Sequence, residues 1–214
     1  MNMLEKIRNK FMGNPVLRRL WQIVRIPLAI ILVLFVGLVI YRIPVVMERQ
    51  KTEEVVEKIH SQKLTLADVS GERLPPEPDP VLKDATIEGI DANNNGIRDD
   101  VELAIFKLHP DSARIRAAEL QYAMALQNEL SNVFNSETLV VALWEESRGY
   151  FCIDEAMPNA TDATFNSTIK EIKNLAFNVE FRKSKIEEIL AKYMTSHTNP
   201  SDQFCDVDFN ILPN

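Results

Sequence analysis

The sequence predicts a mainly α-helical protein, with one membrane helix near the N-terminus and a helical bundle in the C-terminal part. Three observations support this fold class. An apolar run of membrane-spanning character lies within the first 45 residues, apolar side chains recur at helical spacing after residue 99, and no segment alternates convincingly between apolar and polar residues as a half-buried strand does. The chain has six glycines in 214 residues, which supports few tight turns.

The apolar run covers residues 26–41, which carry no charge between Arg25 and Arg42. Sixteen helical residues extend about 24 Å, and apolar neighbours lengthen the predicted transmembrane helix to residues 20–43. The run is longer than the apolar core of a signal peptide, and no cleavage site of small residues follows it. An uncleaved signal anchor is therefore predicted, rather than a cleaved leader or a buried soluble helix, which normally keeps a polar stripe.

Charge is distributed unevenly about this helix. Of the chain's 24 basic and 31 acidic residues, six basic residues and one acidic residue lie within residues 1–25, which leaves 18 basic and 30 acidic residues in the rest. Because basic flanks stay on the cytoplasmic side, residues 1–25 are predicted to be a cytoplasmic basic leader, and the C-terminal part to be periplasmic or extracellular. The acidic outer part argues against nucleic acid as a partner, since binding it requires a clustered basic face.

The segment after the membrane helix changes character twice. Residues 44–69 are charged and helix-prone, so they predict a stalk that continues the membrane helix beyond Pro44. Residues 70–90 change to proline, acidic and short apolar residues, which is typical of an extended linker. Residues 91–214 are numerous enough to bury a modest core as one domain.

Helical periodicity and turn residues divide this domain into five predicted helices. They are Asp99–Leu108, a long helix from Pro110-Asp111 through about Val133, a helix opened by Ser136-Glu137, a helix after a loop at residues 157–161, and a last helix with Ile186, Ile189, Leu190, Tyr193 and Met194 on one face.

The most chemically specific stretch is the dodecamer of residues 91–102, which fits the calcium-loop pattern D-x-[DN]-x-[DN]-G-x5-E at every defined position. Ca²⁺ takes about six to eight oxygen ligands, and a loop of this length supplies them from alternate positions. The expected ligands are the side chains of Asp91, Asn93 and Asn95, the carbonyl of Ile97, Asp99 directly or through a water, and both oxygens of Glu102. Gly96 lies where such a loop turns sharply.

A simpler explanation of the same residues is a turn followed by a helix start. Asn and Asp favour turns, and Asp99, Asp100 and Glu102 suit the first turn of the next helix without any ion. That explanation covers the last four residues of the dodecamer, but not the oxygen-bearing side chains at positions one, three, five, nine and twelve together. Calcium binding is therefore the favoured interpretation.

The dodecamer resembles an EF-hand loop, and more closely the single calcium loops of bacterial surface proteins and thrombospondin type 3 repeats. The resemblance covers the loop and its exiting helix, and it implies a half EF-hand with Ca²⁺ as the bound ion. Two departures stand out: Arg98 occupies position eight, where an EF-hand usually has an apolar residue, and four prolines within residues 74–80 exclude an incoming helix. With one loop and two neutral asparagines among its ligands, a structural role and a dissociation constant of roughly 10⁻⁴–10⁻³ M are expected.

The two cysteines, Cys152 and Cys205, both lie in the predicted outer part. An oxidising compartment favours an intrachain disulfide between them, and closing this loop stabilises the domain by about 4 kcal/mol on the chain-entropy model. Two separate buried thiols or an intermolecular bridge are the alternatives.

Residues of catalytic type are sparse in the predicted outer domain. His109 and His197 each lie beside a predicted helix end, and Glu145 and Glu146 are adjacent, so they do not face each other on a helix. No nucleophile elbow, histidine zinc motif or phosphate-binding glycine loop occurs. No enzymatic activity is expected.

The predicted function is a membrane-tethered, calcium-binding scaffold or interaction module of the cell envelope, with an envelope protein as its partner. The alternative is a small-ligand-binding domain or an enzyme accessory subunit with a pocket between its helices.

Overall fold

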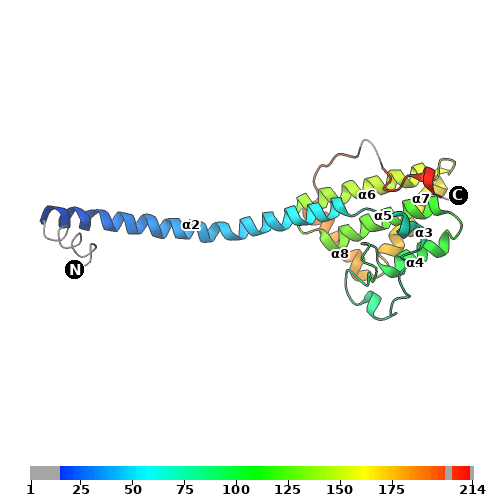
Figure 1. The fold of residues 1–214 in the computed structure, drawn as a ribbon, viewed down its shortest axis with the longest axis horizontal. Coiled ribbons are helices and arrows are strands. Elements are labelled where there is room, and N and C mark those ends of the chain that lie inside the picture. Colours follow the sequence, from blue (N-terminus) through cyan, green and yellow to red (C-terminus); the bar gives the residue numbers. More distant parts are fainter. Residues whose placement is uncertain (1–14, 201–203, 213–214) are drawn as a thin grey trace. The chain divides into compact units, whose positions relative to one another are not determined.

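The computed structural model describes residues 15–200 and 204–212, and all structural statements below refer to these residues. The described chain is helical and contains no strand. Residues 1–14 of the predicted basic leader lie outside the described range. The helices, labelled in Figure 1, are α2 (Pro15–Ser61), α3 (Leu66–Ser70), α4 (Asp99–Leu108), α5 (Ala113–Asn132), α6 (Ser136–Ala156), α7 (Asp162–Ala176) and α8 (Glu180–Tyr193), with 3-10 turns η1 (Leu82–Asp84) and η2 (Phe209–Ile211).

The chain divides into two compact units, residues 1–51 and residues 52–214. The described part of the first unit belongs to α2, which is long and apolar enough to cross a membrane and contains the predicted span at residues 20–43. Its apolar side chains are exposed, as expected of a surface that faces lipid rather than a protein core. The helix continues through Pro27 and Pro44, in agreement with the predicted extension beyond Pro44.

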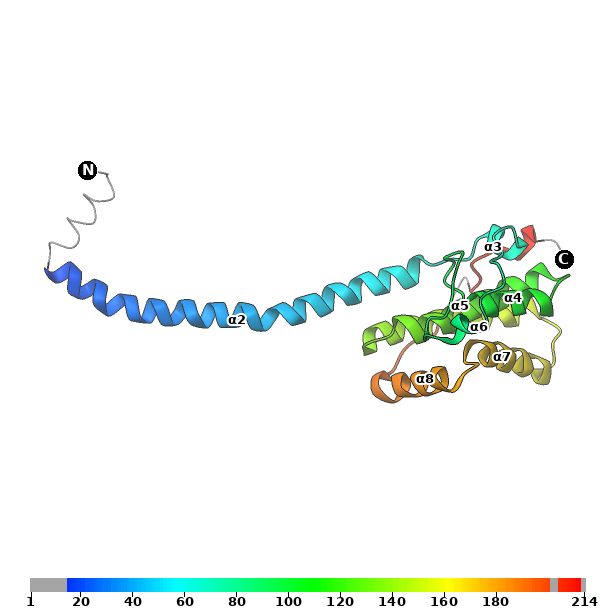
Figure 2. The same cartoon turned by 90° about the horizontal axis from the view of Figure 1, so that it is seen from below.

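The second unit is built around α5. Fifteen of the 20 residues of α5 are buried, and α3, α4, α6, α7 and α8 all pack against it. A helix surrounded in this way has no solvent face, so its sequence shows little amphipathic pattern. Figure 2 shows α7 and α8 following one another along the α5–α6 pair.

The close approach of α5 and α6 depends on Gly149. A Cβ atom at this position would lie 2.8 Å from the Cα atom and 3.1 Å from the backbone nitrogen of Tyr122 on α5. Both atoms belong to the backbone and cannot move aside as a flexible side chain would. The missing Cβ therefore sets the distance between the two longest helices of the second unit.

A local capping residue explains where α5 begins. The long helix starts at Ala113 rather than at Pro110-Asp111, because the Ser112 side chain accepts a hydrogen bond from the Ile115 backbone nitrogen. The helix predicted at Asp99–Leu108 has those bounds in the structure.

The last helix buries part of the predicted face. Ile186 and Ile189 are buried, and Leu190 is half-buried. Met194 lies beyond the end of α8 and is 54% exposed, so it does not belong to that face.

The second unit begins at Thr52, whereas the sequence predicted a domain boundary at residue 91. Ile59, Leu64 and Val69 are buried, and they place most of the predicted stalk within the folded unit. A short helix, α3, forms there because Thr65 and Asp68 make a reciprocal capping box.

The proline-rich segment at residues 70–90 is also fixed to the folded unit, although it was predicted to be an extended linker. The side chain of Arg182, fully buried on α8, donates hydrogen bonds to the carbonyl oxygens of Lys83, Thr86 and Ile87 at 2.8–3.1 Å. It also pairs with Asp84 at 2.7 Å. An irregular segment has no helical ladder of its own, so a side chain from α8 satisfies its carbonyls.

Substitution Gly149→Ala is expected to destabilise the second unit by about 1–3 kcal/mol, because overpacking against the Tyr122 backbone outweighs the better helix propensity of alanine. Urea denaturation of the full-length protein in detergent, followed by circular dichroism, measures the change. Ser184→Ala on the exposed side of α8 is the control, and equal stability of all three proteins would contradict the proposed close approach.

Candidate metal site

The dodecamer connects the irregular segment after α3 to the first turn of α4. Asp99, Asp100 and Glu102 occupy this first turn, where the helix dipole favours negative charge. No helix enters the loop, since α3 ends at Ser70 and η1 is only three residues long. The sequence had excluded an incoming helix on the basis of the prolines in residues 74–80.

The first half of the loop folds its side-chain oxygens back onto its own backbone. Asp91 accepts hydrogen bonds from the backbone nitrogens of Asn95 and Gly96 at 3.1 and 2.9 Å. Asn93 Oδ1 lies 3.3 Å from the same Asn95 nitrogen, and Asn95 Oδ1 accepts a bond from the Ile97 nitrogen at 2.9 Å. The three predicted side-chain ligands of this half are therefore gathered on the inner side of one turn.

The backbone of this turn requires two left-handed residues. Asn94 has φ of 55° and Gly96 has φ of 88°. Asparagine tolerates that region and glycine adopts it without a steric penalty, which explains the Asn-Asn-Gly order at residues 94–96. The role predicted for Gly96 as the sharp turn of the loop agrees with this conformation.

The second half of the loop is tied to the first by its two acids. Asp99 Oδ1 accepts a hydrogen bond from the Ala92 nitrogen at 2.9 Å, and Glu102 Oε2 accepts one from Asn93 Nδ2 at 3.0 Å. Ile97 has a buried side chain that packs in the main core, so only its backbone can serve the loop. The side chains of Asp91, Asn93, Asn95, Asp99 and Glu102 thus all form hydrogen bonds with other residues of the loop.

Asp99 and Glu102 also have oxygens without partners. Both residues are at most 1% exposed, and Asp99 Oδ2 and Glu102 Oε1 are buried without a hydrogen bond. Burial, partly offset by a hydrogen bond from Asn93, raises the pKa of Glu102 to about 7, and burial also raises the pKa of Asp99. Buried oxygens of this kind are costly unless a donor or a cation satisfies them, so these residues fit a hard cation.

Arg98, at position eight of the loop, is buried and turns away from the predicted ion site. Its guanidinium donates to the carbonyl oxygens of Leu175 and Ala176 at 2.8 and 3.0 Å and pairs with Asp100. These carbonyls belong to the last turn of α7, which has no intrahelical donors for them. Arg98, the residue that departs from the EF-hand pattern, therefore joins the loop to α7.

Two adjacent acids on α6, Glu145 and Glu146, do not form an acid–base pair. Glu145 and Glu146 point to different partners, as their adjacent positions predicted: Glu145 pairs with Arg148, and Glu146 accepts bonds from Tyr122 and Lys173 at 3.0 and 2.9 Å.

A second pair of carboxyl groups was not apparent from the sequence. Glu129 on α5 is buried, and burial followed by the nearby charge of Glu146 raises the pKa of Glu129 well above its ordinary value. Burial and a neighbouring carboxylate both disfavour the charged form, so Glu129 is favoured in its neutral form. No sequence pattern marks this pair, because its members lie 17 positions apart on different helices.

His109 also has a partner that the sequence did not indicate. Its Nε2 atom lies 2.9 Å from Oε1 of Glu119, which is buried in α5. Burial raises the pKa of Glu119 to about 8 and lowers the pKa of His109. Both groups are therefore favoured in their neutral forms at neutral pH, which suits a buried hydrogen bond.

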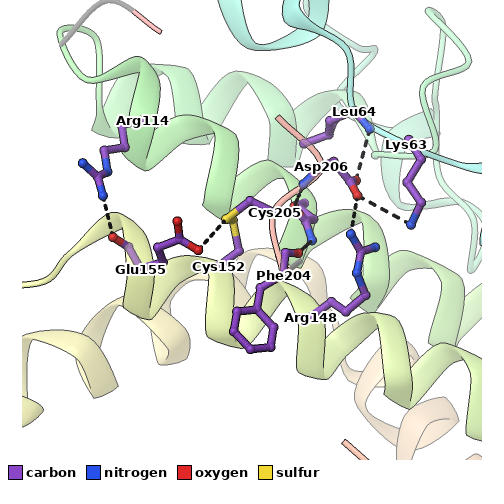
Figure 3. The surroundings of a disulfide bond; sticks show 10 residues. Lys63, Leu64, Arg114, Arg148, Cys152, Glu155, Phe204, Cys205 and Asp206 are labelled. Carbon is purple, nitrogen blue, oxygen red and sulfur yellow. Dashed lines mark hydrogen bonds and ion pairs between the residues drawn. A yellow bond between two sulfur atoms is a disulfide. The ribbon is translucent and has the colours of Figure 1, made fainter. Parts of the chain in front are cut away.

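Cys152 and Cys205 form a disulfide, with Cα atoms 5.0 Å apart, as the sequence predicted for an intrachain pair. Figure 3 shows how the segment after Phe204 lies along α6. Asp206 accepts a bond from the Leu64 nitrogen at 3.3 Å and pairs with Arg148 at 2.8 Å. The disulfide thus holds a C-terminal segment that is bonded both to α6 and to the residues that follow α2.

A cavity of about 460 Å³ lies beside this segment. It is lined by Arg114, Glu155 and residues 204–210. It lies against the C-terminal segment rather than in an apolar space among the helices, so it does not have the character of the ligand pocket considered as an alternative.

Within residues 15–200 and 204–212, no three His, Cys, Asp or Glu side chains form a group that could hold a metal ion. Three of the six predicted loop ligands are asparagine side chains or a backbone carbonyl, so acidic groups alone are not expected to complete this site. Comparisons of the chain with protein-family models, with curated proteins and with solved structures found no match.

Substitution Glu129→Gln is expected to weaken the pH dependence of stability. The folded chain keeps a proton on Glu129 that the unfolded chain releases as pH rises above about 4.5, so stability is lost with rising pH until Glu129 ionises in the folded state as well. A neutral glutamine removes this loss, and the variant should therefore gain stability relative to the wild type between pH 5 and pH 8.

Urea denaturation of the full-length protein at each pH measures this difference. Glu187→Gln, on the exposed surface of α8, should follow the wild-type profile. A difference between Glu129→Gln and wild type that does not change with pH would show that Glu129 is already ionised in the folded protein.

Proposed function

We propose that this chain is a membrane-anchored protein whose helical domain binds one calcium ion outside the cytoplasm, and that the ion has a structural role. The observation that carries the proposal is the geometry of residues 91–102. Their side-chain oxygens gather on one side of a turn, and Asp99 and Glu102 retain buried oxygens without partners. The chemistry of this set is all oxygen, which suits a hard cation such as Ca²⁺.

The loop ligands would act in the order expected of a twelve-residue calcium loop. Asp91, Asn93 and Asn95 supply side-chain oxygens from the turn, and Ile97 supplies its carbonyl. Glu102 is fixed at its Oε2 atom by Asn93, while its Oε1 atom is unpartnered. A divalent cation would offset the repulsion among Asp91, Asp99 and Glu102, whose charges are otherwise unpaired within the loop.

A structural role is supported by what the loop connects. On one side Arg98 holds the end of α7, and on the other side Arg73 exchanges two hydrogen bonds with Asn93. An ion bound between these contacts would fix the irregular segment before α4 against the bundle. The sequence contains one such loop, so the pairing of two loops that produces cooperative sensing is not expected.

The membrane assignment rests on α2 and on the distribution of charge. The apolar stretch of α2 is long enough to span a bilayer, and the residues before it are basic while those after it are acidic. We infer an uncleaved signal anchor with a cytoplasmic N-terminus and a periplasmic or extracellular domain. The Cys152–Cys205 pair suits the oxidising conditions of such a compartment.

The biological role that best fits these features is non-enzymatic: a tethered scaffold or interaction module that contacts another envelope protein. Glu145 pairs with Arg148 and His109 with Glu119, and the cavity beside Cys205 borders the C-terminal segment. Crosslinking in intact membranes followed by purification through a tag on this chain tests the proposal. Recovery of one stable protein partner is expected.

Calcium is expected to raise the melting temperature of the full-length protein in detergent. At a calcium concentration of about 100 times the dissociation constant, binding to the folded state contributes about 2.7 kcal/mol, or roughly 5–10 °C for a domain of this size. Asp91→Ala should abolish the difference between calcium and chelator, whereas Glu187→Ala on the surface of α8 should retain it. Identical melting curves for the wild type in calcium and in chelator would rule out the calcium site.

The proposed topology predicts that external protease removes a C-terminal tag from spheroplasts of a bacterial host. In the same cells Cys152 and Cys205 should resist alkylation until a reductant is added, since a disulfide has no free thiol. A tag that is protected until the membrane is dissolved, together with freely alkylated cysteines, would place the domain in the cytoplasm instead.

A further inference from the structure

Asp68 is a buried acid outside the dodecamer that the calcium proposal does not use. It lies in α3 and is 2% exposed. Its Oδ2 atom accepts hydrogen bonds from the backbone nitrogen and the hydroxyl of Thr65, at 2.9 and 2.6 Å, and so caps the helix. Its Oδ1 atom is also buried, and it accepts no hydrogen bond.

One residue links Asp68 to position three of the loop. Arg73 Nη1 lies 3.5 Å from Asp68 Oδ1, and Arg73 Nη2 donates to the Asn93 carbonyl at 3.2 Å. The Arg73 carbonyl in turn accepts a bond from Asn93 Nδ2 at 2.9 Å, and the same nitrogen donates to Glu102. Asp68 and Glu102 are therefore connected through two intervening side chains.

The buried acids near Arg73 carry more negative charge than Arg73 can compensate. Asp68, Asp99 and Glu102 are all buried, and each has one carboxyl oxygen without a hydrogen bond. Arg73 is the cation in contact with Asp68, and its side chain is 47% exposed, so solvent weakens the compensation that it provides.

We propose that the cation site extends beyond the dodecamer to Asp68, whose buried carboxylate supplies an additional negative charge from α3. This inference rests on the calcium proposal and adds a residue to that site. It also gives α3 a function, because this short helix holds Asp68 through its capping box with Thr65. A negative charge close to a cation site attracts the cation, so Asp68 makes binding tighter than the dodecamer alone would.

Isothermal titration of the full-length protein in detergent with calcium chloride tests the proposal. Asp68→Asn keeps an oxygen for the Thr65 cap but removes the charge, and it should weaken calcium binding by about tenfold. Thr65→Ala is the matched control, because it removes the hydroxyl of the cap but leaves the charge of Asp68 in place. It should lower the melting temperature and leave the calcium affinity within about twofold of the wild type.

The calcium affinity of the Arg73→Gln variant distinguishes an electrostatic role of Asp68 from a purely structural one. Removing a positive charge from the neighbourhood of Asp68 should leave calcium binding at least as tight as in the wild type, although two contacts of the side chain are lost. Wild-type affinity in Asp68→Asn, or equal weakening in all three variants, would overturn the role of Asp68 and leave the loop proposal intact. An absence of calcium binding by the wild type would overturn both.

Discussion

The burial of α5 on all sides is the constraint on which the second unit depends. A helix in that position must fill its surroundings with apolar side chains and satisfy every polar group that it carries. Its alanines and Leu120, Leu126 and Leu130 meet the first requirement. Gly149 on α6 allows the two backbones to approach closely enough for this core to be continuous.

The polar residues of α5 meet the second requirement by fixing the segments that lack regular structure. Arg116 donates to the carbonyls of Val69, His109 and Pro110, and it thereby joins the end of α3 to the turn before α5. Gln121 bonds to the backbone on either side of Cys205. Together with Arg98 and Arg182, these side chains act as donors for carbonyls that no helix satisfies. The irregular segments of the domain are thus held by charged and polar groups, whereas the helices are held by apolar contact.

The dependence of the irregular segments on polar and charged contacts explains why a cation fits the start of α4. Three acids at the two ends of the irregular segment between α3 and α4 are buried: Asp68 in α3, and Asp99 and Glu102 in the first turn of α4. Buried carboxylates need donors or cations, and arginines supply only part of that compensation. A divalent ion bound by residues 91–102 would supply the remainder and would stabilise this segment against the bundle.

The sequence by itself determined the helical class, the long apolar helix near the N-terminus, the approximate helix bounds and the cysteine pair, because each depends on local periodicity, on run length or on a set with one possible pairing. It also identified residues 91–102 as a calcium-loop pattern, since such a loop draws its ligands from one continuous stretch of the chain. The ion itself remains a proposal. Tertiary structure alone decided that residues 52–90 belong to the folded unit, because Arg182 lies about 95 positions away from the carbonyls that it binds. It also decided the burial of Glu129 and of Asp68, since contacts between distant helices leave no periodic signal in the chain.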